Sequence, residues 1–338
     1  MNIMKDAFNR EIDYVRLSLT DRCDLRCTYC MPATGLCFLK KEQLLTDDEI
    51  IFLLRILAKE GIKKVKLTGG EPLVRPNLLS LIKRIKQISG IEKVTLTTNG
   101  MKLAREAQGL KEAGLDGINI SLDTLDPEEF REITRVGQLR NVLAGLEQAI
   151  DVGLPNIKIN TVARKELSEA TIVELAEIAK KETVHLRFIE MMPIGLGKEH
   201  PGKQQEEVED ILTKHYGTLQ PYQKPLGNGP ASYYALKDFK GKIGFISALG
   251  HCFCETCNRI RITADGHLKT CLHSADGYSL KEALAKEQTA ELLGIIKSGI
   301  ACKPEKHLFL EQQGEQRFMS QILAREEAHR KRKFLKST

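Results

Sequence analysis

Six of the nine cysteines in this 338-residue sequence fall into two tight groups. The first group is Cys23, Cys27 and Cys30, and the second is Cys254, Cys257 and Cys271. Thiolates are the ligands that zinc and iron–sulfur clusters prefer. Three thiolates on one short loop leave one coordination position of a metal centre open to a small molecule. The first group therefore predicts a metal centre that binds a ligand directly, with a zinc site completed by a distant residue as the alternative.

The second group fits zinc and an iron–sulfur cluster equally well on spacing alone. A Cys-x2-Cys pair with one further Cys and one His forms an ordinary zinc site, and His251, His267 and His273 are nearby. The remaining cysteines, which are Cys37, Cys252 and Cys302, are expected to be inert thiols. An odd number of cysteines in a chain with no export signal argues against a disulfide scaffold.

Alternating strands and helices must position these cysteines. Apolar alternation predicts strands at 13–19, 63–68, 93–98, 117–121, 157–162 and 184–189. Helical patterns begin at the capping box Thr46–Glu49 and end by Gly61, and they recur at 77–89, 102–113, 127–153 (broken near Gly137) and 168–181. This order predicts right-handed βαβ units and a parallel sheet. An open doubly wound sheet and a partial (β/α) barrel both fit the pattern.

The composition changes after residue 194. Residues 195–230 are rich in Gly, Pro, Lys and Gln and surround one short predicted helix near 205–215. Two hairpins follow, one about Lys240-Gly241 and one turning at Asp265-Gly266, and then helices at 279–286 and 288–298. We expect a first domain at 1–194, connecting loops at 195–230, a C-terminal domain with the second cysteine group at 231–325, and a charged, solvated tail at 326–338.

The overall composition excludes a disordered chain, because 42% of the residues are hydrophobic and 28% are charged. A net charge of +6 suits an anionic small substrate and is too small to predict nucleic-acid binding. The most apolar stretch, 50–58, is far shorter than the roughly 20 residues that cross a membrane. We therefore expect a cytoplasmic protein with no membrane and no nucleic-acid partner.

Basic residues recur on one face of the predicted strands, at Arg16, Lys66, Lys158 and Arg187. Barrel interiors are usually filled by branched apolar side chains. Several inward cations would repel one another and lose hydration unless an anion lay between them. The pattern predicts an anion site of triphosphate size, with solvent-facing strand edges as the alternative.

Cys23-x3-Cys27-x2-Cys30, with Tyr29 before the third cysteine, resembles the signature of radical S-adenosylmethionine (SAM) enzymes. Gly69-Gly70-Glu71-Pro72, at the carboxyl end of the predicted strand 63–68, resembles the motif that meets the SAM amino group in that superfamily. The segments 97–100 and 121–123 resemble further superfamily positions. The resemblance implies a [4Fe-4S] cluster on the first group, whose open iron binds SAM and cleaves it to a 5′-deoxyadenosyl radical. It also implies an α/β fold, a partial (β/α)6 TIM-like barrel with a C-terminal extension of β-hairpins and helices that covers the barrel opening.

The segment from Cys254 to Arg261, with Asp265-Gly266 and Cys271 after it, resembles one radical SAM family, the GTP 3′,8-cyclases. The similarity continues to 303–307. It implies a second [4Fe-4S] cluster on Cys254, Cys257 and Cys271, whose open iron binds the guanine of GTP. It implies SAM contacts at Tyr29, Gly70, Ser121 and Met192. It implies GTP contacts at Arg16, Lys66, Thr97, Lys158, Arg187, Arg259 and Arg261.

The implied enzyme is a lyase of molybdenum cofactor biosynthesis. The radical would remove the 3′ hydrogen of GTP, and the ribose radical would add to guanine C8, giving (8S)-3′,8-cyclo-7,8-dihydroguanosine 5′-triphosphate. The implied partners are an electron donor, the downstream cyclic pyranopterin monophosphate synthase, and a second copy in a homodimer.

The sequence departs from the family at two places. Lys66 stands where Arg is common, which keeps the charge but loses the bidentate fork. The family ends in Gly-Gly, whereas here Arg317–Ile322 is followed by Leu323, Ala324 and a charged tail. Two alternatives remain open: a radical SAM enzyme of the peptide-modifying type with an auxiliary cluster, and a zinc-stabilised nucleotide-binding protein.

Overall fold

Six parallel strands form the centre of the molecule. The computed structural model describes residues 3–274, 277–307 and 309. The strands adjoin in chain order, and they are β1 (Tyr14–Ser18), β2 (Lys64–Thr68), β3 (Lys93–Thr98), β4 (Gly117–Ser121), β5 (Ile157–Ala163) and β6 (His185–Glu190). A doubly wound sheet reverses its strand order at a switch point. No reversal occurs between β1 and β6, so the sheet is singly wound, an order that is consistent with the expected partial barrel.

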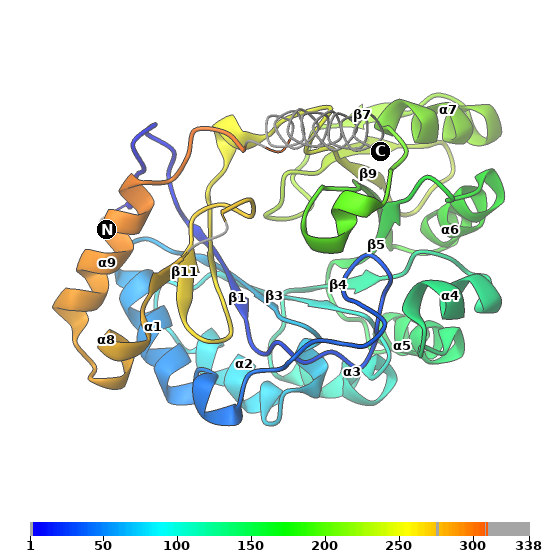
Figure 1. Ribbon diagram of the computed structural model, residues 1–338. Helices are drawn as coiled ribbons and strands as arrows, with labels where there is room; N and C mark the ends of the chain where they lie inside the picture. The colour runs from blue at the N-terminus through cyan, green and yellow to red at the C-terminus, as the bar shows by residue number, and fades with distance from the viewer. Residues whose placement is uncertain (1–2, 275–276, 308, 310–338) are drawn as a thin grey trace, which may run out of the picture.

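The helices between these strands cover the outer side of the curved sheet (Figure 1). They are α1 (Asp47–Lys59), α2 (Leu78–Lys86), α3 (Leu103–Glu112), α4 (Pro127–Thr134), α5 (Leu139–Asp151) and α6 (Glu169–Lys181). The predicted capping box of α1 is confirmed, since Thr46 Oγ1 accepts from the Glu49 amide and the Glu49 carboxylate accepts from the Thr46 amide. The predicted break near Gly137 separates α4 from α5.

Two later hairpins extend the sheet at its two edges. One edge continues as β9 (Ile243–Ile246), β8 (Ser232–Ala235) and β7 (Gln220–Tyr222), and the other as β10 (Arg259–Ile262), β11 (His267–Lys269) and β12 (Tyr278–Ser279). β9 pairs in parallel with β6, and β10 pairs in parallel with β1. Both hairpins are antiparallel, as predicted.

The sheet curls around a cavity. Side chains from β1, β2, β3, β4, β5, β6, β9 and β10 all line the same space, which a flat sheet would not allow. Their apolar neighbours along the strands, such as Val15, Leu17, Val65 and Leu67, are buried on the other face against the helices. On β1 and β2 the alternation therefore divides the strand between an apolar outer face and a polar inner face.

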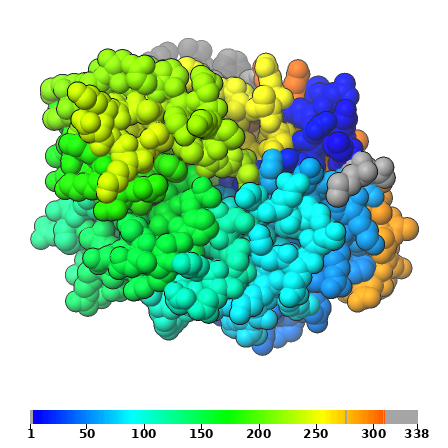
Figure 2. Space-filling view, turned by 180° about the vertical axis from the view of Figure 1, so that it is seen from behind, coloured from blue at the N-terminus to red at the C-terminus, as the bar shows by residue number. Residues whose placement is uncertain are grey.

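Three further helices complete the described part of the chain, namely α7 (Gln205–Tyr216), α8 (Lys281–Ala285) and α9 (Thr289–Ala301). The N-terminal segment packs beside the late segments, as the space-filling view shows (Figure 2). Arg10 joins them, because its guanidinium donates to the carbonyl oxygens of Cys254, Pro304 and Glu305. Among the described residues, no helix is both long enough and apolar enough to span a membrane.

Candidate active site

The first cysteine group lies on the loop between β1 and α1, at the carboxyl end of the parallel strands. This is the end at which α/β barrels carry their sites. The amide of Cys30 donates to the Cys27 carbonyl, and the amides of Arg26 and Thr28 donate to the carbonyls of Thr134 and Ile133 at the end of α4. The loop is therefore fixed both within itself and to the neighbouring helix.

The Gly69-Gly70 pair lets the cysteine loop approach the end of β2. The Gly70 amide donates to the Thr20 carbonyl at 2.7 Å, and the Glu71 amide donates to the Arg22 carbonyl at 2.7 Å. A β-carbon on Gly70 would lie 2.2 Å from the Arg22 carbonyl oxygen, which leaves no room for any other residue. The motif thus positions the start of the cysteine loop through its backbone.

Glu71 links this motif to the end of β3. Its buried carboxylate accepts hydrogen bonds from Thr98 Oγ1 at 2.7 Å and from the Asn99 amide at 2.6 Å. Burial raises the pKa of Glu71 to about 7, although these hydrogen bonds oppose the rise. Asn99 in turn donates from Nδ2 towards the Cys23 sulfur at 3.8 Å.

The three early thiols have different acidities. Burial raises the pKa of Cys23 to about 11. A hydrogen bond between Cys27 and Cys30 raises the pKa of Cys27 and lowers the pKa of Cys30. Cys23 and Cys27 are therefore thiols in the metal-free chain, and binding of a cation would displace their protons.

The second cysteine group lies on the wall of the central cavity. Cys254 and Cys257 flank a short 3₁₀ turn before β10, and Cys271 follows β11. Although burial acts to raise it, the pKa of Cys257 is lowered by the charges of Arg259 and Lys303. Lys303 is buried and also donates to the carbonyl oxygens of Arg259 and Thr270. A buried ammonium group thus stabilises the thiolate form of Cys257.

Five cations surround the same cavity. They come from four strands (β1, β2, β6 and β10) and are Arg16, Lys66, Arg187, Arg259 and Arg261. No Asp or Glu occurs among the described residues that line it. Burial lowers the pKa of Lys66 and of Arg261, and neighbouring cations lower both further. This concentration of like charge is unfavourable without a counter-ion.

Most of these cations lack a protein partner. Within the described part of the chain, no side-chain hydrogen bond or ion pair involves Arg16, Lys66 or Arg261, and Arg16 Nε is buried with no hydrogen-bond partner. Buried polar groups are normally paired. Arg187 does have a partner, since it donates to Asn160 Oδ1 at 2.9 Å from Nε. The unpaired donors fit an anion in the cavity.

A second cavity adjoins the first at the amino ends of the strands. The two share Tyr14, Lys66, Asn119, Arg187 and Gly229. Lys158 borders only the second cavity, where burial and the charge of Arg187 lower the pKa of Lys158 to about 7. The positive region therefore extends along the barrel axis.

The structure brings most of the residues named in the sequence analysis to one place. The central cavity is lined by Arg16, Lys66, Thr97, Arg187, Met192, Arg259, Arg261 and the late cysteines, and Lys158 borders the adjoining one. Tyr29, Gly70, Ser121 and the early cysteines are not among its lining residues. They lie at the carboxyl ends of β1, β2 and β4.

Sequence reasoning did not assign five side chains at this site. Asn119 and Asn160 line the cavity from β4 and β5, and the apolar–polar alternation of those strands could have indicated them. Phe253 lies under the Arg259 guanidinium, 4.9 Å from its centre to the ring. His307, rather than His251, His267 or His273, lies near Cys254, and Cys252 lies beside both. Nothing local in the sequence indicates a contact between residues more than 50 positions apart.

The spacing of the thiols can be compared with the spacing that a single zinc ion requires. Sulfur ligands on one zinc, at about 2.3 Å each, lie about 3.8 Å from one another. Within residues 3–274, 277–307 and 309, only Cys252, Cys254 and His307 form a set of three metal-ligating groups whose ligand atoms lie within 4.8 Å. Neither predicted triplet therefore brings all three of its sulfur atoms this close together, although Cys27 and Cys30 are hydrogen-bonded to each other.

Comparison with known proteins gives the family. Residues 17–179 match the model of the radical SAM superfamily, and residues 184–309 match the model named Molybdenum Cofactor Synthesis C. In solved structures, the chain superposes on Streptococcus suis SuiB with a TM-score of 0.61 at 17% identity, covering 88% of this chain and 73% of that one. This likeness shows a shared fold.

Curated relatives are much closer in sequence. GTP 3′,8-cyclase of Clostridium perfringens (strain SM101 / Type A) is 46% identical over 322 residues, which cover 94% of this chain and 99% of that protein. GTP 3′,8-cyclase of Pelotomaculum thermopropionicum is 43% identical over 326 residues, with 94% and 99% coverage. The chain therefore belongs to the GTP 3′,8-cyclase family of the radical SAM superfamily.

Proposed function

We propose that this chain is a GTP 3′,8-cyclase that acts in molybdenum cofactor biosynthesis. The observation that carries the proposal is the central cavity, which has the late cysteines on one wall, five cations around it and no described acidic residue. A triphosphate supplies the missing counter-charge, and a base can lie against the thiol-bearing wall. The relatives named GTP 3′,8-cyclase support the same substrate.

Two [4Fe-4S] clusters and SAM are the cofactors of the proposed enzyme. Cys23, Cys27 and Cys30 would hold one cluster, and Cys254, Cys257 and Cys271 would hold the other, called the auxiliary cluster below. With SAM bound, the first cluster supplies a 5′-deoxyadenosyl radical. Tyr29, Gly70, Ser121 and Met192 would contact SAM.

The cavity residues bind and orient the substrate. Arg16, Lys66, Lys158 and Arg187 carry positive charge along the barrel axis and would hold the phosphates, with Thr97 contributing a hydroxyl. Arg259 and Arg261 lie on β10, directly after the late cysteine pair, and would join the base end to the phosphate end. Fixing GTP at both ends holds its ribose in one place, which favours reaction at a single hydrogen.

Apolar side chains also line the cavity, and with substrate bound they would help to exclude water. Ile189, Met192, Ile246 and Phe253 give the cavity an apolar lining between its cations. A dry site strengthens the electrostatic contacts with the phosphates and prevents side reactions of the radical.

The proposed enzyme also has partners and a location in the cell. The enzyme needs an electron donor, passes its product to cyclic pyranopterin monophosphate synthase and forms a homodimer. All nine cysteines are free, which suits the reducing cytoplasm. The proposed enzyme would consist of a barrel domain at 1–194, connecting loops at 195–230, a C-terminal domain at 231–325 and a charged tail at 326–338. Residues 317–324 and the tail, where the family's Gly-Gly ending is replaced, lie outside the described residues.

The test is anaerobic reconstitution with iron and sulfide, followed by incubation with SAM, GTP and a strong reductant. We expect a cyclised nucleotide and 5′-deoxyadenosine, with the hydrogen abstracted from the 3′ position traced by deuterium. Arg16→Ala should form no cyclised nucleotide. The control is Arg105→Ala, which changes an exposed arginine paired with Glu106 and should keep the activity. A colourless zinc protein, or a brown protein that cleaves SAM but does not bind GTP, would contradict the proposal.

A further inference from the structure

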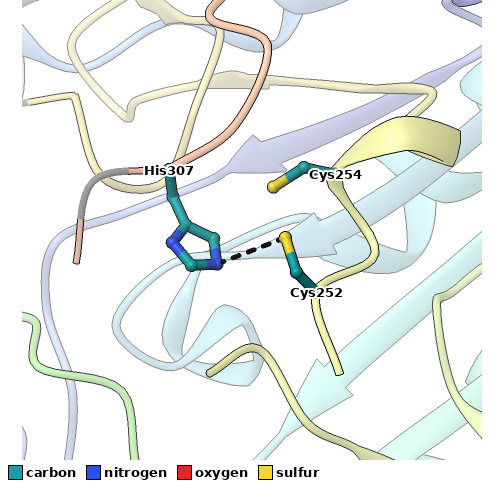
Figure 3. Close-up of side chains that lie close together, drawn as sticks. All are labelled: Cys252, Cys254 and His307. Carbon is teal, nitrogen blue, oxygen red and sulfur yellow. Dashed lines mark hydrogen bonds between the residues drawn. The ribbon is translucent and has the colours of Figure 1, made fainter. Parts of the chain in front are cut away.

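Cys252, Cys254 and His307 form a compact cluster at the edge of the central cavity (Figure 3). One ligand atom from each lies within 4.8 Å of the others. The His307 Nε2 atom is 3.7 Å from the Cys252 sulfur. Cys252 is exposed, so the cluster opens to solvent on one side.

The chemistry of this donor set is that of a mononuclear metal site. Two thiolates and one imidazole are ligands that Zn²⁺ prefers, and three protein ligands with a water in the fourth position make a common open zinc site. All three ligand atoms lie within 4.8 Å of one another, and ligands on one zinc ion lie about 3.8 Å apart, so a small adjustment would bring them to one metal ion. We propose that Cys252, Cys254 and His307 bind one thiophilic divalent cation, of the Zn²⁺ class, in the chain that lacks its auxiliary cluster.

Metal binding here and the auxiliary cluster are mutually exclusive. Cys254 belongs to both ligand sets, and one thiolate cannot complete both. This second part rests on the proposed function, whereas metal binding by the cluster-free chain does not. Exposed Cys252 gives an incoming ion its first contact, before Cys254 is engaged.

The site binds metal less tightly than a structural zinc site would. His307 Nε2 also lies 2.7 Å from the carbonyl oxygen of Ala248, so its proton is held there in the metal-free chain. Ligation through this nitrogen displaces that proton and breaks that hydrogen bond. Metal binding at the site therefore competes with this hydrogen bond.

The experiment uses Co²⁺ as a spectroscopic probe for Zn²⁺. Full-length protein is prepared cluster-free under anaerobic conditions, with Cys23, Cys27 and Cys30 changed to Ala so that the early group binds nothing. Co²⁺ titration should give sulfur-to-metal charge-transfer bands and tetrahedral ligand-field bands at one equivalent. Circular dichroism checks that each variant is folded.

Two matched cysteine variants identify the ligands. Cys252→Ser should weaken Co²⁺ binding at least tenfold, whereas Cys257→Ser and the distant exposed Cys302→Ser should bind as the parent does. The proposal is overturned if Cys252→Ser binds normally, if Cys257→Ser loses binding, which would assign the metal to the late triplet, or if no band appears.

A second measurement tests the competition for Cys254. Chains with wild-type early cysteines are loaded with Zn²⁺ and then reconstituted with iron and sulfide. After zinc loading, we expect wild-type chains to take up one [4Fe-4S] cluster and Cys252→Ser chains to take up two. Equal iron content in both would overturn the competition. Failure of both chains to take a second cluster without zinc would instead count against the proposed function.

Discussion

The hydroxyl of Tyr29 donates a hydrogen bond of 2.6 Å to the Asp123 carboxylate. This contact joins the early cysteine loop to the segment that follows β4. Asp123 is buried and also accepts from the Val162 amide on β5, so one carboxylate links three parts of the barrel rim. Burial raises the pKa of Asp123, and the two hydrogen bonds oppose that rise.

Removing this carboxylate should loosen the cysteine loop. Asp123→Ala leaves the hydroxyl of half-buried Tyr29 without its acceptor, which costs about 1–3 kcal/mol of unfolding free energy. Tyr29→Phe should cost less, because Asp123 keeps the Val162 amide. Urea unfolding of the two single variants and the double variant measures the coupling, and strictly additive effects would argue against it.

The two cysteine triplets should have separable roles. Cys30→Ala should abolish SAM cleavage, because the cluster that binds SAM loses a ligand. Cys271→Ala should retain uncoupled SAM cleavage but form no cyclised nucleotide. Chromatography of 5′-deoxyadenosine and of the nucleotide separates the outcomes, with exposed Cys37→Ala as the control. Cyclisation by both variants would disprove the two-cluster assignment.

Gly70 should tolerate no side chain. In Gly70→Ala the added carbon meets the Arg22 carbonyl at 2.2 Å, so the cysteine loop must shift. We expect SAM cleavage to fall at least tenfold and the unfolding free energy to fall by about 1–3 kcal/mol. Gly294→Ala on α9 is the control, since no atom lies within 4 Å of its added carbon. The unfolding free energy of Gly294→Ala should rise by about 0.5–1 kcal/mol. If both variants changed in the same way in stability and in SAM cleavage, the proposed clash at Gly70 would be wrong.

GTP affinity should fall as the pH rises above about 7. Lys158, whose pKa burial lowers to about 7, is charged below that pH and neutral above it in the free protein. Phosphate favours the ammonium form, so binding takes up a proton, and the affinity falls by up to about tenfold per pH unit above 7. Calorimetry between pH 6 and 9 measures this slope.

The arginine variant provides the control for this pH effect. Lys158→Arg stays charged across the range, so its affinity should depend less on pH. Burial also lowers the pKa of Lys66, so Lys158→Arg is compared with the parent chain, in which Lys66 and the ligand are the same. An unchanged slope in Lys158→Arg would show that Lys158 does not contact the phosphates.

Local patterns in the sequence predicted most of the fold. All six central strands and the break between α4 and α5 are confirmed, because each depends on periodicity and turn residues within a few positions. β7 was not predicted, since it has only three residues, includes Pro221 and lies in a segment rich in Gly and Pro. The hairpins themselves were predicted, but not that they join opposite edges of one sheet, because strand pairing at long range has no local signal.

The candidate site could be predicted only in part. Inward cations such as Arg16 and Lys66 follow from strand alternation, and the cysteine spacing is visible directly. The approach of His307 to Cys252 is set by the path of the chain after α9, which no spacing reveals. The contact of Arg10 with three carbonyl groups also depends on that path.

The parallel pairing of β10 with β1 has a consequence for biosynthesis. During translation, β1 leaves the ribosome more than 200 residues before its partner, with Arg16 awaiting Arg261 in the register. Until β10 is made, the β1 edge of the sheet has unpaired backbone N–H and C=O groups. A chaperone that binds this edge would protect the nascent chain from aggregation. The auxiliary cluster proposed on Cys254, Cys257 and Cys271 can therefore be inserted only after most of the chain has been synthesised.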